Sequence, residues 1–358
     1  MTNLLLSELS NQDIDWMLQT GTRADLAAGT MLLHPDQTAD QLFIVLQGAL
    51  KAALAAPQST GSVPAVQLSS GEMVGTFPLL ESALPYVAAS ALTEVTVLAL
   101  PRRALEHKLQ EDLNFAAHLY RVSAQMLANR LEAMVQQLGH GSEMGLSRLQ
   151  LKEASTVFAE LQDQDLDWLI AVGQVRTLEP KAILQRQGRP VDALHILLEG
   201  AVTLRAEALT SPETPLPSPL LNAFEPVAAV DSELAAEAAQ EIARLSRGDL
   251  VGETVFLDAL PPAYQVQTLR ECQVLSVPRW RLESKLLYDD GFAARIFRIL
   301  ALLLANKQQL FFQQLGILAE SPEISSQLLN RLALAEARFE WMVKRIQSQV
   351  VSGRELKW

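Results

Sequence analysis

Two short stretches of this sequence contain the residues that could hold an anionic ligand. Residues 71–77 read GEMVGTF and residues 248–254 read GDLVGET. A turn glycine, an apolar pair and a second glycine that opens a short helix leave backbone N–H groups free to bind an anion. The spacing therefore predicts two related ligand sites. The candidate ligand-binding residues are Gly252, Glu253 and Thr254, with Gly75 and Thr76 as their counterparts.

The other reactive residue types do not cluster. The five histidines are scattered along the chain, and none is paired at a metal-ligand spacing such as i, i+4. The sequence contains neither a nucleophile-elbow motif nor a phosphate-loop motif. We therefore expect no catalytic residue, no metal site and no enzymatic activity. His195 lies in an apolar run and is interpreted as a core histidine.

The composition favours a protein of the cytoplasm. The 358 residues suffice for two domains, and they carry a net charge of -12 with a pI near 5.0. This acidic balance argues against nucleic acid or an anionic membrane as a partner. Cys272 is the only cysteine, which excludes an intrachain disulfide. No secretory signal is visible, and no apolar run reaches the about 20 residues of a membrane span.

A tandem repeat accounts for the two glycine stretches. The run Asp13–Trp16 recurs as Asp165–Trp168, an offset of 152 residues, and Gly48 recurs as Gly200 at the same offset. The glycine stretches, and the segments that follow them, recur at a second and larger offset, at which Gly75 matches Gly252. One insertion, between Gly200 and Gly248, therefore separates two otherwise colinear halves.

Each half has the pattern of a mixed helical and β unit. A short helix with acidic residues in its first turn precedes short apolar runs punctuated by Gly, Pro and Asp, which is typical of a small all-β body. A long helix then closes each half, at residues 113–138 and 292–315. We expect a first domain over residues 1–140, a second over 150–316 and a C-terminal amphipathic helix over 321–352.

The insertion occupies about residues 206–246. Its first part, Thr210 to Pro226, is rich in Pro and Ser and predicts an exposed loop. Its second part, Ser232 to Leu245, is rich in Ala and Glu and predicts a short exposed helix.

Three helices have apolar faces that must be covered. The long helix at 292–315 is apolar all round, whereas its counterpart is expected to expose Arg121, Gln125 and Arg130. We expect either that the two long helices pack on each other or that the second contacts another molecule. The tail has a heptad-like seam that could pair with its own copy, contact a partner helix or pack on its own protein. The candidate interface residues are Leu303 and Phe311 in the second long helix, and Leu332, Phe339 and Met342 in the tail.

Both halves resemble cyclic-nucleotide-binding domains, the modules of the catabolite activator protein and of protein kinase A regulatory subunits. The resemblance rests on residues 28–30 and 40–48, on residues 179–181 and 192–200, and on the two glycine stretches. It implies the fold class α+β, with two antiparallel, jelly-roll-like β-rolls, each with flanking helices and a long C-terminal helix, and a helical tail. It also implies that a ligand lies inside the roll, under the short helix of the glycine stretch.

The family's phosphate-binding cassette implies three roles. Backbone N–H groups hold the phosphate, a glutamate after the second glycine accepts the ribose hydroxyl, and an arginine about nine residues further on neutralises the phosphate. Gly252 and Glu253 match the first two roles, whereas Pro262 stands at the arginine position. In the first half Thr76 replaces the glutamate, and the arginine position is Pro85, or Tyr86 if the gap moves by one residue. The degenerate positions are therefore Gly75, Thr76, Pro85 and Pro262.

Three functions follow as hypotheses. The leading one is a non-catalytic regulatory or assembly protein that contacts another protein, or its own copy, through the long helices and the tail. The second is a sensor that binds a cyclic nucleotide, its only cofactor, in the second half. The third is a transcription regulator, although the tail shows one continuous periodicity where a DNA-binding motif requires two crossed helices.

Overall fold

The structure is a computed structural model of the whole chain. It describes residues 4–34, 40–54, 65–75, 87–138, 149–150, 154–206, 240–257, 262, 264–314 and 326–351.

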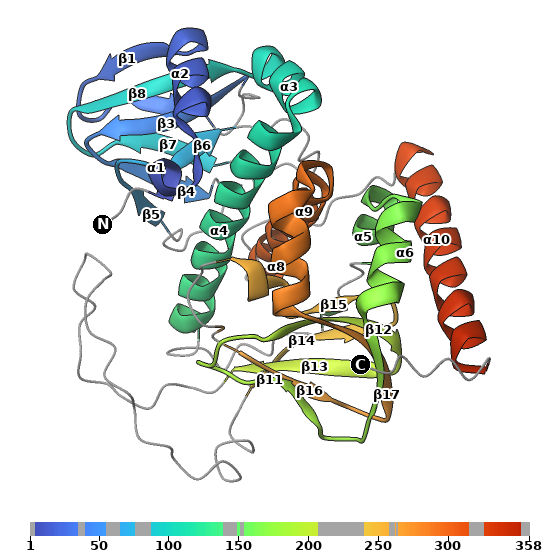
Figure 1. Cartoon of the computed structure of the whole chain (residues 1–358). Helices are drawn as coiled ribbons and strands as arrows, with labels where there is room; N and C mark the ends of the chain where they lie inside the picture. Colours follow the sequence, from blue (N-terminus) through green and yellow to red (C-terminus); the bar gives the residue numbers. More distant parts are fainter. Residues whose placement is uncertain are drawn as a thin grey trace. The chain divides into compact units, whose positions relative to one another are not determined.

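The first copy of the repeat folds as a β-roll with helices at both ends of its sequence (Figure 1). Its described strands form two antiparallel sheets with the orders β1-β8-β3-β6 and β2-β7-β4-β5. Aliphatic side chains such as Val45, Leu50 and Val97 fill the space between the sheets and are fully buried. The elements are α1 (Leu4–Glu8), α2 (Asn11–Thr20), β1 (Thr22–Leu26), β2 (Met31–Leu33), β3 (Gln41–Gln47), β4 (Leu50–Leu54), β5 (Ala65–Leu68), β6 (Met73–Gly75), β7 (Val87–Ala91), β8 (Val95–Pro101), α3 (Arg102–Glu111) and α4 (Leu113–Leu138).

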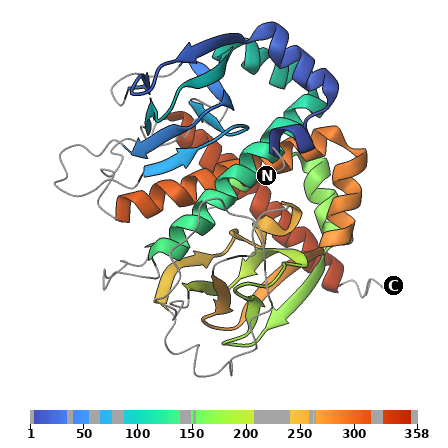
Figure 2. The ribbon, with the colours of Figure 1, turned by 90° about the vertical axis from the view of Figure 1, so that its left-hand side faces the viewer.

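The second copy repeats this plan, and Figure 2 shows the strands of each copy curling into a roll. Its described sheets have the orders β10-β17-β12-β15 and β11-β16-β13-β14-β9, in which only the β14–β9 pair is parallel. The elements are β9 (Leu149–Gln150), α5 (Ala154–Glu160), α6 (Asp163–Val172), β10 (Gln174–Leu178), β11 (Ile183–Gln185), β12 (Ala193–Glu199), β13 (Ala201–Ala206), β14 (Gln240–Ser246), β15 (Leu250–Val251), the 3₁₀-helix η1 (Glu253–Phe256), β16 (Gln265–Thr268), β17 (Cys272–Pro278), α8 (Arg279–Tyr288), α9 (Asp290–Gln314) and the tail helix α10 (Ser326–Val351).

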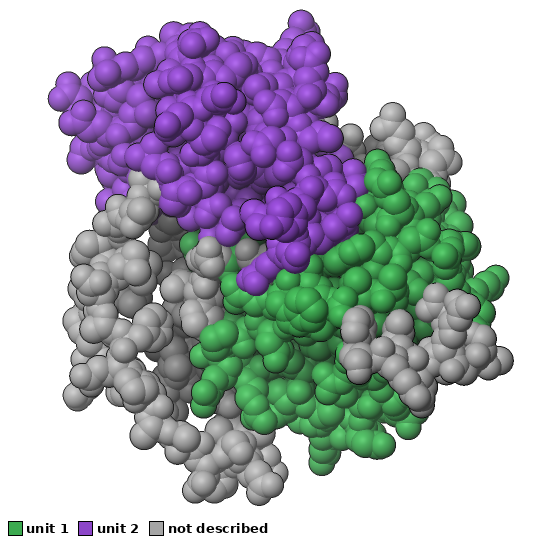
Figure 3. Space-filling view, viewed as in Figure 1, with its two compact units in different colours: residues 1, 129–282, 332–358 green, residues 2–128, 283–331 purple. Residues whose placement is uncertain are grey.

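The chain divides into two compact units whose boundaries differ from those of the repeat (Figure 3). Unit 1 contains residues 1, 129–282 and 332–358, and therefore combines the second β-roll with α10. Unit 2 contains residues 2–128 and 283–331, and therefore combines the first β-roll with α9.

Within unit 2 the long helices α4 and α9 pack on each other. The Gln308 side-chain amide donates to the Leu127 carbonyl at 2.6 Å, and the Arg121 guanidinium lies 5.7 Å from the centre of the Phe297 ring. Apolar side chains on every side of α9, Leu303 among them, are buried. Of the two arrangements expected for the long helices, the structure therefore shows the one in which they contact each other. The expectation that Gln125 is exposed on α4 is wrong, because this side chain is buried.

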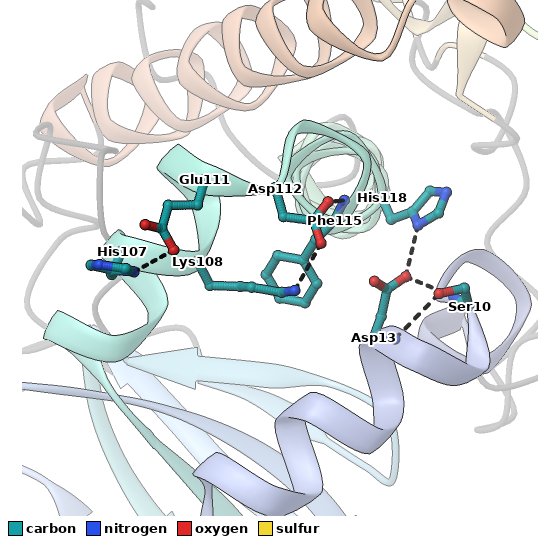
Figure 4. Close-up of polar contacts among 8 residues, drawn as sticks. All are labelled: Ser10, Asp13, His107, Lys108, Glu111, Asp112, Phe115 and His118. Atoms are coloured by element: carbon teal, nitrogen blue, oxygen red, sulfur yellow. Dashed lines mark hydrogen bonds and ion pairs between the residues drawn. The ribbon is translucent and has the colours of Figure 1, made fainter.

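One polar junction joins the last two helices of each roll in the same way. Lys108 Nζ pairs with Asp112 Oδ2 at 2.7 Å, and the Phe115 backbone N–H donates to Asp112 Oδ1 at 3.0 Å (Figure 4). These two bonds lower the pKa of the Asp112 carboxyl. Lys285 and Asp289 make the same junction between α8 and α9, also at 2.7 Å, and there too the lysine bond lowers the pKa of the aspartate. The repeat therefore extends to individual side-chain contacts.

An acidic residue fixes the start of α2 and holds this helix to α4. Asp13 forms a capping box with Ser10, in which the Ser10 N–H donates to Asp13 Oδ2 at 2.8 Å. The same carboxylate oxygen lies 2.8 Å from His118 Nδ1 on α4 (Figure 4). Asp13 is buried, so the side of α2 that carries it is the side that faces the body of unit 2.

Part of the interpretation of the insertion is wrong. Residues 240–245 were expected to end a helix, but they form β14, which pairs with β13 along its whole length. This strand is the counterpart of β5, at the larger of the two repeat offsets. Pairing with a neighbouring strand overrides the helix propensity of Ala- and Glu-rich residues. The expected loop at 210–226 and the beginning of the expected helix lie outside the described residues.

Candidate ligand site in the second copy

The backbone of the second glycine stretch has the geometry that its sequence predicts. Gly252 has φ 86° and ψ 29°, a left-handed conformation, and it caps the N-terminus of η1. A Cβ atom at this position would lie 2.5 Å from the Ala193 carbonyl oxygen on β12. Only glycine therefore fits between η1 and the strand. Gly75 in the first copy also has a positive φ, and a Cβ atom there would lie 2.5 Å from the carbonyl oxygen of Gln41, the first residue of β3.

A buried carboxylate holds the turn that leads into the cassette, which we define as residues 248–257. Asp249 Oδ2 accepts a hydrogen bond from the Ser246 N–H at 2.7 Å, and Oδ1 accepts one from the Ala154 N–H at 3.2 Å. In the first copy Glu72 accepts the equivalent bond from the Ser69 N–H at 2.7 Å. Both cassettes are therefore anchored by an acidic residue directly after the first glycine.

The glutamate that could accept a ribose hydroxyl has a partner within the protein. The Tyr264 hydroxyl donates to Glu253 Oε1 at 2.9 Å, and the two residues are only 4% and 2% exposed. Tyr264 comes two residues after Pro262 and directly before β16, so this bond connects η1 to the beginning of the next strand. Thr254 is also buried.

The position of the expected arginine is occupied by a buried proline. Pro262 accepts a hydrogen bond at its carbonyl from the Gly188 N–H at 2.8 Å, and the Gln185 side-chain amide donates to the Tyr264 carbonyl at 3.3 Å. Both bonds fix this segment against β11 and the turn after it. The sequence from Gly252 to Leu269 contains neither arginine nor lysine. From Gly252 to Leu269 the sequence therefore offers backbone groups and a carboxylate but no cationic side chain.

His195 is a core residue, as its place in an apolar run predicts. It lies on β12 opposite Ser276 on β17, and its Nδ1 is 2.8 Å from the Ser276 hydroxyl oxygen. Burial, with a smaller contribution from the charge of Arg176, lowers the pKa of His195 to about 4. In the first copy Phe43 and Ala99 occupy the same two opposed positions. The histidine is therefore neutral at physiological pH. Over the described residues, no group of three or more His, Cys, Asp or Glu side chains could hold a metal ion.

The other predicted site residues divide into three groups. Leu303, Phe339 and Met342 are buried within the chain. Phe311 and Leu332 lie on α9 and α10, but their side chains are outside the described part of the structure. Thr76 and Pro85 of the first cassette are also outside it. The proposal that these residues form an interface or a degenerate ligand site stays a prediction.

The sequence patterns predict neither the Tyr264–Glu253 bond nor the ion pairs that the arginines of α10 make with α6. Arg338 and Arg345 make ion pairs with Asp163 and Asp167 on α6, at 3.5 and 3.0 Å. The sequence does carry a signal for each of these contacts. A tyrosine follows the cassette glutamate by eleven residues, and two arginines beside the tail seam are spaced seven residues apart.

Comparisons with known proteins agree with the fold. The family model of the cyclic nucleotide-binding domain matches residues 23–112. The HTH-type transcriptional regulator Cmr of Mycobacterium tuberculosis (strain CDC 1551 / Oshkosh) is 28% identical over 158 residues, which is 44% of this chain and 64% of that protein. This chain therefore spans less than two thirds of the regulator's length.

Two solved structures illustrate the range of similar chains. Cyclic AMP-bound PfPKA-R is 16% identical, with 79% of each chain covered and a TM-score of 0.29. The catabolite activator protein of Thermus thermophilus is 20% identical, with 50% of this chain and 76% of that chain covered and a TM-score of 0.31.

Proposed function

We propose that this protein, a cyclic nucleotide-binding domain protein whose fold occurs twice in the chain, is a non-catalytic regulatory protein that acts without a cyclic nucleotide. The single observation that carries the proposal is the hydrogen bond between the buried Tyr264 and Glu253, a buried residue of the second copy's cassette. The Glu253 carboxylate, which would accept a ribose hydroxyl, already accepts a hydrogen bond from Tyr264. We infer that this internal bond keeps a nucleotide out of the cassette.

The missing cation points in the same direction. A hydrogen bond to a charged group contributes about 1.5–3 kcal/mol, and a phosphate buried without a cation also loses its hydration. Pro262 supplies neither a charge nor an N–H donor. A cyclic nucleotide would therefore have to displace the Tyr264 hydroxyl and would gain no charge-assisted bond in return. Regulation then has to depend on contacts between protein surfaces.

Calorimetry with cyclic AMP and cyclic GMP tests the proposal. We expect no binding at micromolar concentration to the wild-type chain or to Glu253→Ala. Tyr264→Phe is the matched variant, because it removes only the hydroxyl that blocks Glu253. Micromolar binding to the wild type that Glu253→Ala abolishes would overturn the proposal and would establish the sensor function instead.

Transcription regulation is a second candidate, because the M. tuberculosis relative is named as a transcriptional regulator. α10 counts against it: the helix runs without interruption over Ser326–Val351, and Phe339 and Met342 on it are buried. A recognition motif needs two helices joined by a turn. A mobility-shift assay at several salt concentrations decides this point, since specific DNA binding must weaken steeply as salt rises.

We also propose a cytoplasmic location. Cys272, the only cysteine of the chain, is buried, and burial raises the pKa of its thiol, so it is poorly suited to oxidation or exchange. Among the described helices, none is long and apolar enough to cross a membrane.

A further inference from the structure

The tail helix α10 covers one face of the second copy. Figure 1 shows α10 beside α5 and α6, and the contacts between them include both rings and charges. The Phe339 ring lies 4.9 Å from the ring of Phe158 on α5. Arg338 donates to the carbonyl oxygens of Phe158 and Ala159, at 3.3 and 3.2 Å, where α5 ends. The tail therefore binds the C-terminal end of α5 with an aromatic contact and a cation.

The same face continues along α6. Asp163 and Asp167, one helical turn apart, pair with Arg338 and Arg345 of α10. Leu166 and Ile170 share this side of α6 and are 0% and 3% exposed. The covered face therefore consists of apolar side chains with aspartates beside them.

The first copy has this face too, but it is uncovered. At the offset of 152 residues, Leu6 corresponds to Phe158, Ile14 to Leu166 and Leu18 to Ile170. Leu6 and Leu18 are 62% and 55% exposed, and Ile14 is half-buried. Leu18 comes five residues after Asp13, about 140° around the helix axis. It therefore lies on a different side of α2 from the one on which Asp13 bonds to α4. Nothing within the described ranges of the chain lies over these leucines.

The charge of the covered face is present in the first copy as well. Asp15 corresponds to Asp167, the residue that pairs with Arg345, and the Asp15 side chain is exposed. Asn11 replaces Asp163, so one of the two aspartates remains. We call Leu6, Ile14, Asp15 and Leu18 the α1–α2 face.

We propose that the α1–α2 face binds an amphipathic helix of a second protein, with an apolar seam and an arginine that pairs with Asp15. The chain itself shows which chemistry covers this face, because α10 does so in the second copy. The acidic residue beside the exposed leucines complements a basic helix and would repel an acidic one. This inference concerns a surface outside the cassette and does not depend on whether either cassette binds a nucleotide.

A second copy of the chain is not the occupant that the structure favours. The seam of α10, with Ala335, Phe339, Met342 and Ile346, is already buried within unit 1. A second molecule would have to release its own α10 from α5 and α6 before it could offer that helix. A separate protein supplies its helix without this loss.

A labelled peptide with the sequence of residues 326–351 is a suitable probe, because α10 already fits the equivalent face. We expect saturable binding of this peptide to the full-length chain by fluorescence anisotropy. Leu18→Asp should weaken binding by about tenfold or more, since it puts a charge into the apolar contact. Asp15→Arg should weaken binding of the normal peptide and restore binding of a peptide that carries Arg345→Asp.

Gln12→Arg is the matched control. Gln12 corresponds to Gln164, which is exposed in the second copy although α10 is bound there. A new charge at Gln12 therefore lies outside the covered face and should leave binding unchanged. Absence of saturable binding would overturn the proposal. The proposal would also fail if Asp167→Arg abolished peptide binding while Leu18→Asp and Asp15→Arg left it intact, because the peptide would then bind the face of the second copy. A dimer in light scattering that Leu18→Asp converts to a monomer would assign the face to a second copy and would also overturn it.

Discussion

Replacement of His195 and Ser276 by the residues of the first copy should make the second roll more resistant to acid. The unfolded imidazole has a pKa of 6.5, whereas in the folded protein burial lowers the value to about 4. Between these values the unfolded chain binds a proton that the folded chain does not, so stability falls as pH falls. A difference of about 2.5 pKa units corresponds to roughly 3 kcal/mol at about 1.4 kcal/mol per unit.

The double variant His195→Phe/Ser276→Ala isolates this effect. Phe43 and Ala99 occupy the same opposed positions on β3 and β8, so the pair is compatible with the fold, and the double change leaves no buried hydroxyl without its partner. Urea unfolding followed by tryptophan fluorescence gives the free energy of unfolding at each pH from 7 to 4. Relative to the wild type, we expect the variant to gain roughly 3 kcal/mol over this range. Other titrating groups cancel in the comparison. Parallel pH curves for the two proteins would refute the reasoning.

Three further sets of substitutions test separate features. Gly252→Ala should destabilise unit 1 by more than about 1–2 kcal/mol, because the φ of Gly252 is positive and the new Cβ would lie 2.5 Å from a carbonyl oxygen of the neighbouring strand. Gly29 is the control, since its φ is +84° and a Cβ atom there would have no atom within 4 Å. In thermal melts Gly29→Ala should therefore show the cost of the backbone conformation alone. Asp112→Asn and Asp289→Asn should lower the free energy of unfolding at pH 7. A carboxyl with a lowered pKa stabilises the fold above its ordinary pKa and loses this contribution as pH falls, so the cost of each substitution should shrink in acid. A cost that does not change with pH would exclude the ion-pair explanation. Phe339→Ala should cost about 3–5 kcal/mol and expose α10 to limited proteolysis, whereas Trp341→Ala, at an exposed position of the same helix, should be nearly silent.

The sequence predicted the elements that have a repeated counterpart. The two rolls, both long helices and the left-handed glycine before Glu253 all follow from patterns that occur twice at a fixed offset. For the strand β14 the helix propensity of residues 232–245 gives a wrong prediction. Leu245 and Ser246 match Leu68 and Ser69 at the same offset as the two glycine stretches, and this match was the available signal for a strand.

The contacts that decide the state of the cassette could not be predicted in this way. Tyr264 reaches Glu253 only because the roll brings the start of β16 next to η1, and a sequence pattern carries no information on that distance. The same is true of Arg338 and the end of α5, which are about 180 residues apart in the chain. Such contacts are set by tertiary packing, while periodicity reports only on local structure.

The interleaving of the two compact units has a consequence for synthesis of the protein. The first roll belongs to a unit that also contains residues 283–331, so a ribosome has to make most of the chain before that unit can be completed. Gln308 bonds to the Leu127 carbonyl, which lies 181 residues earlier in the chain, and contacts of such large sequence separation form slowly. Until then the apolar side chains of α4 that α9 covers are exposed to other molecules. A nascent chain of this protein should therefore depend on chaperones for longer than a chain whose two repeats fold one after the other.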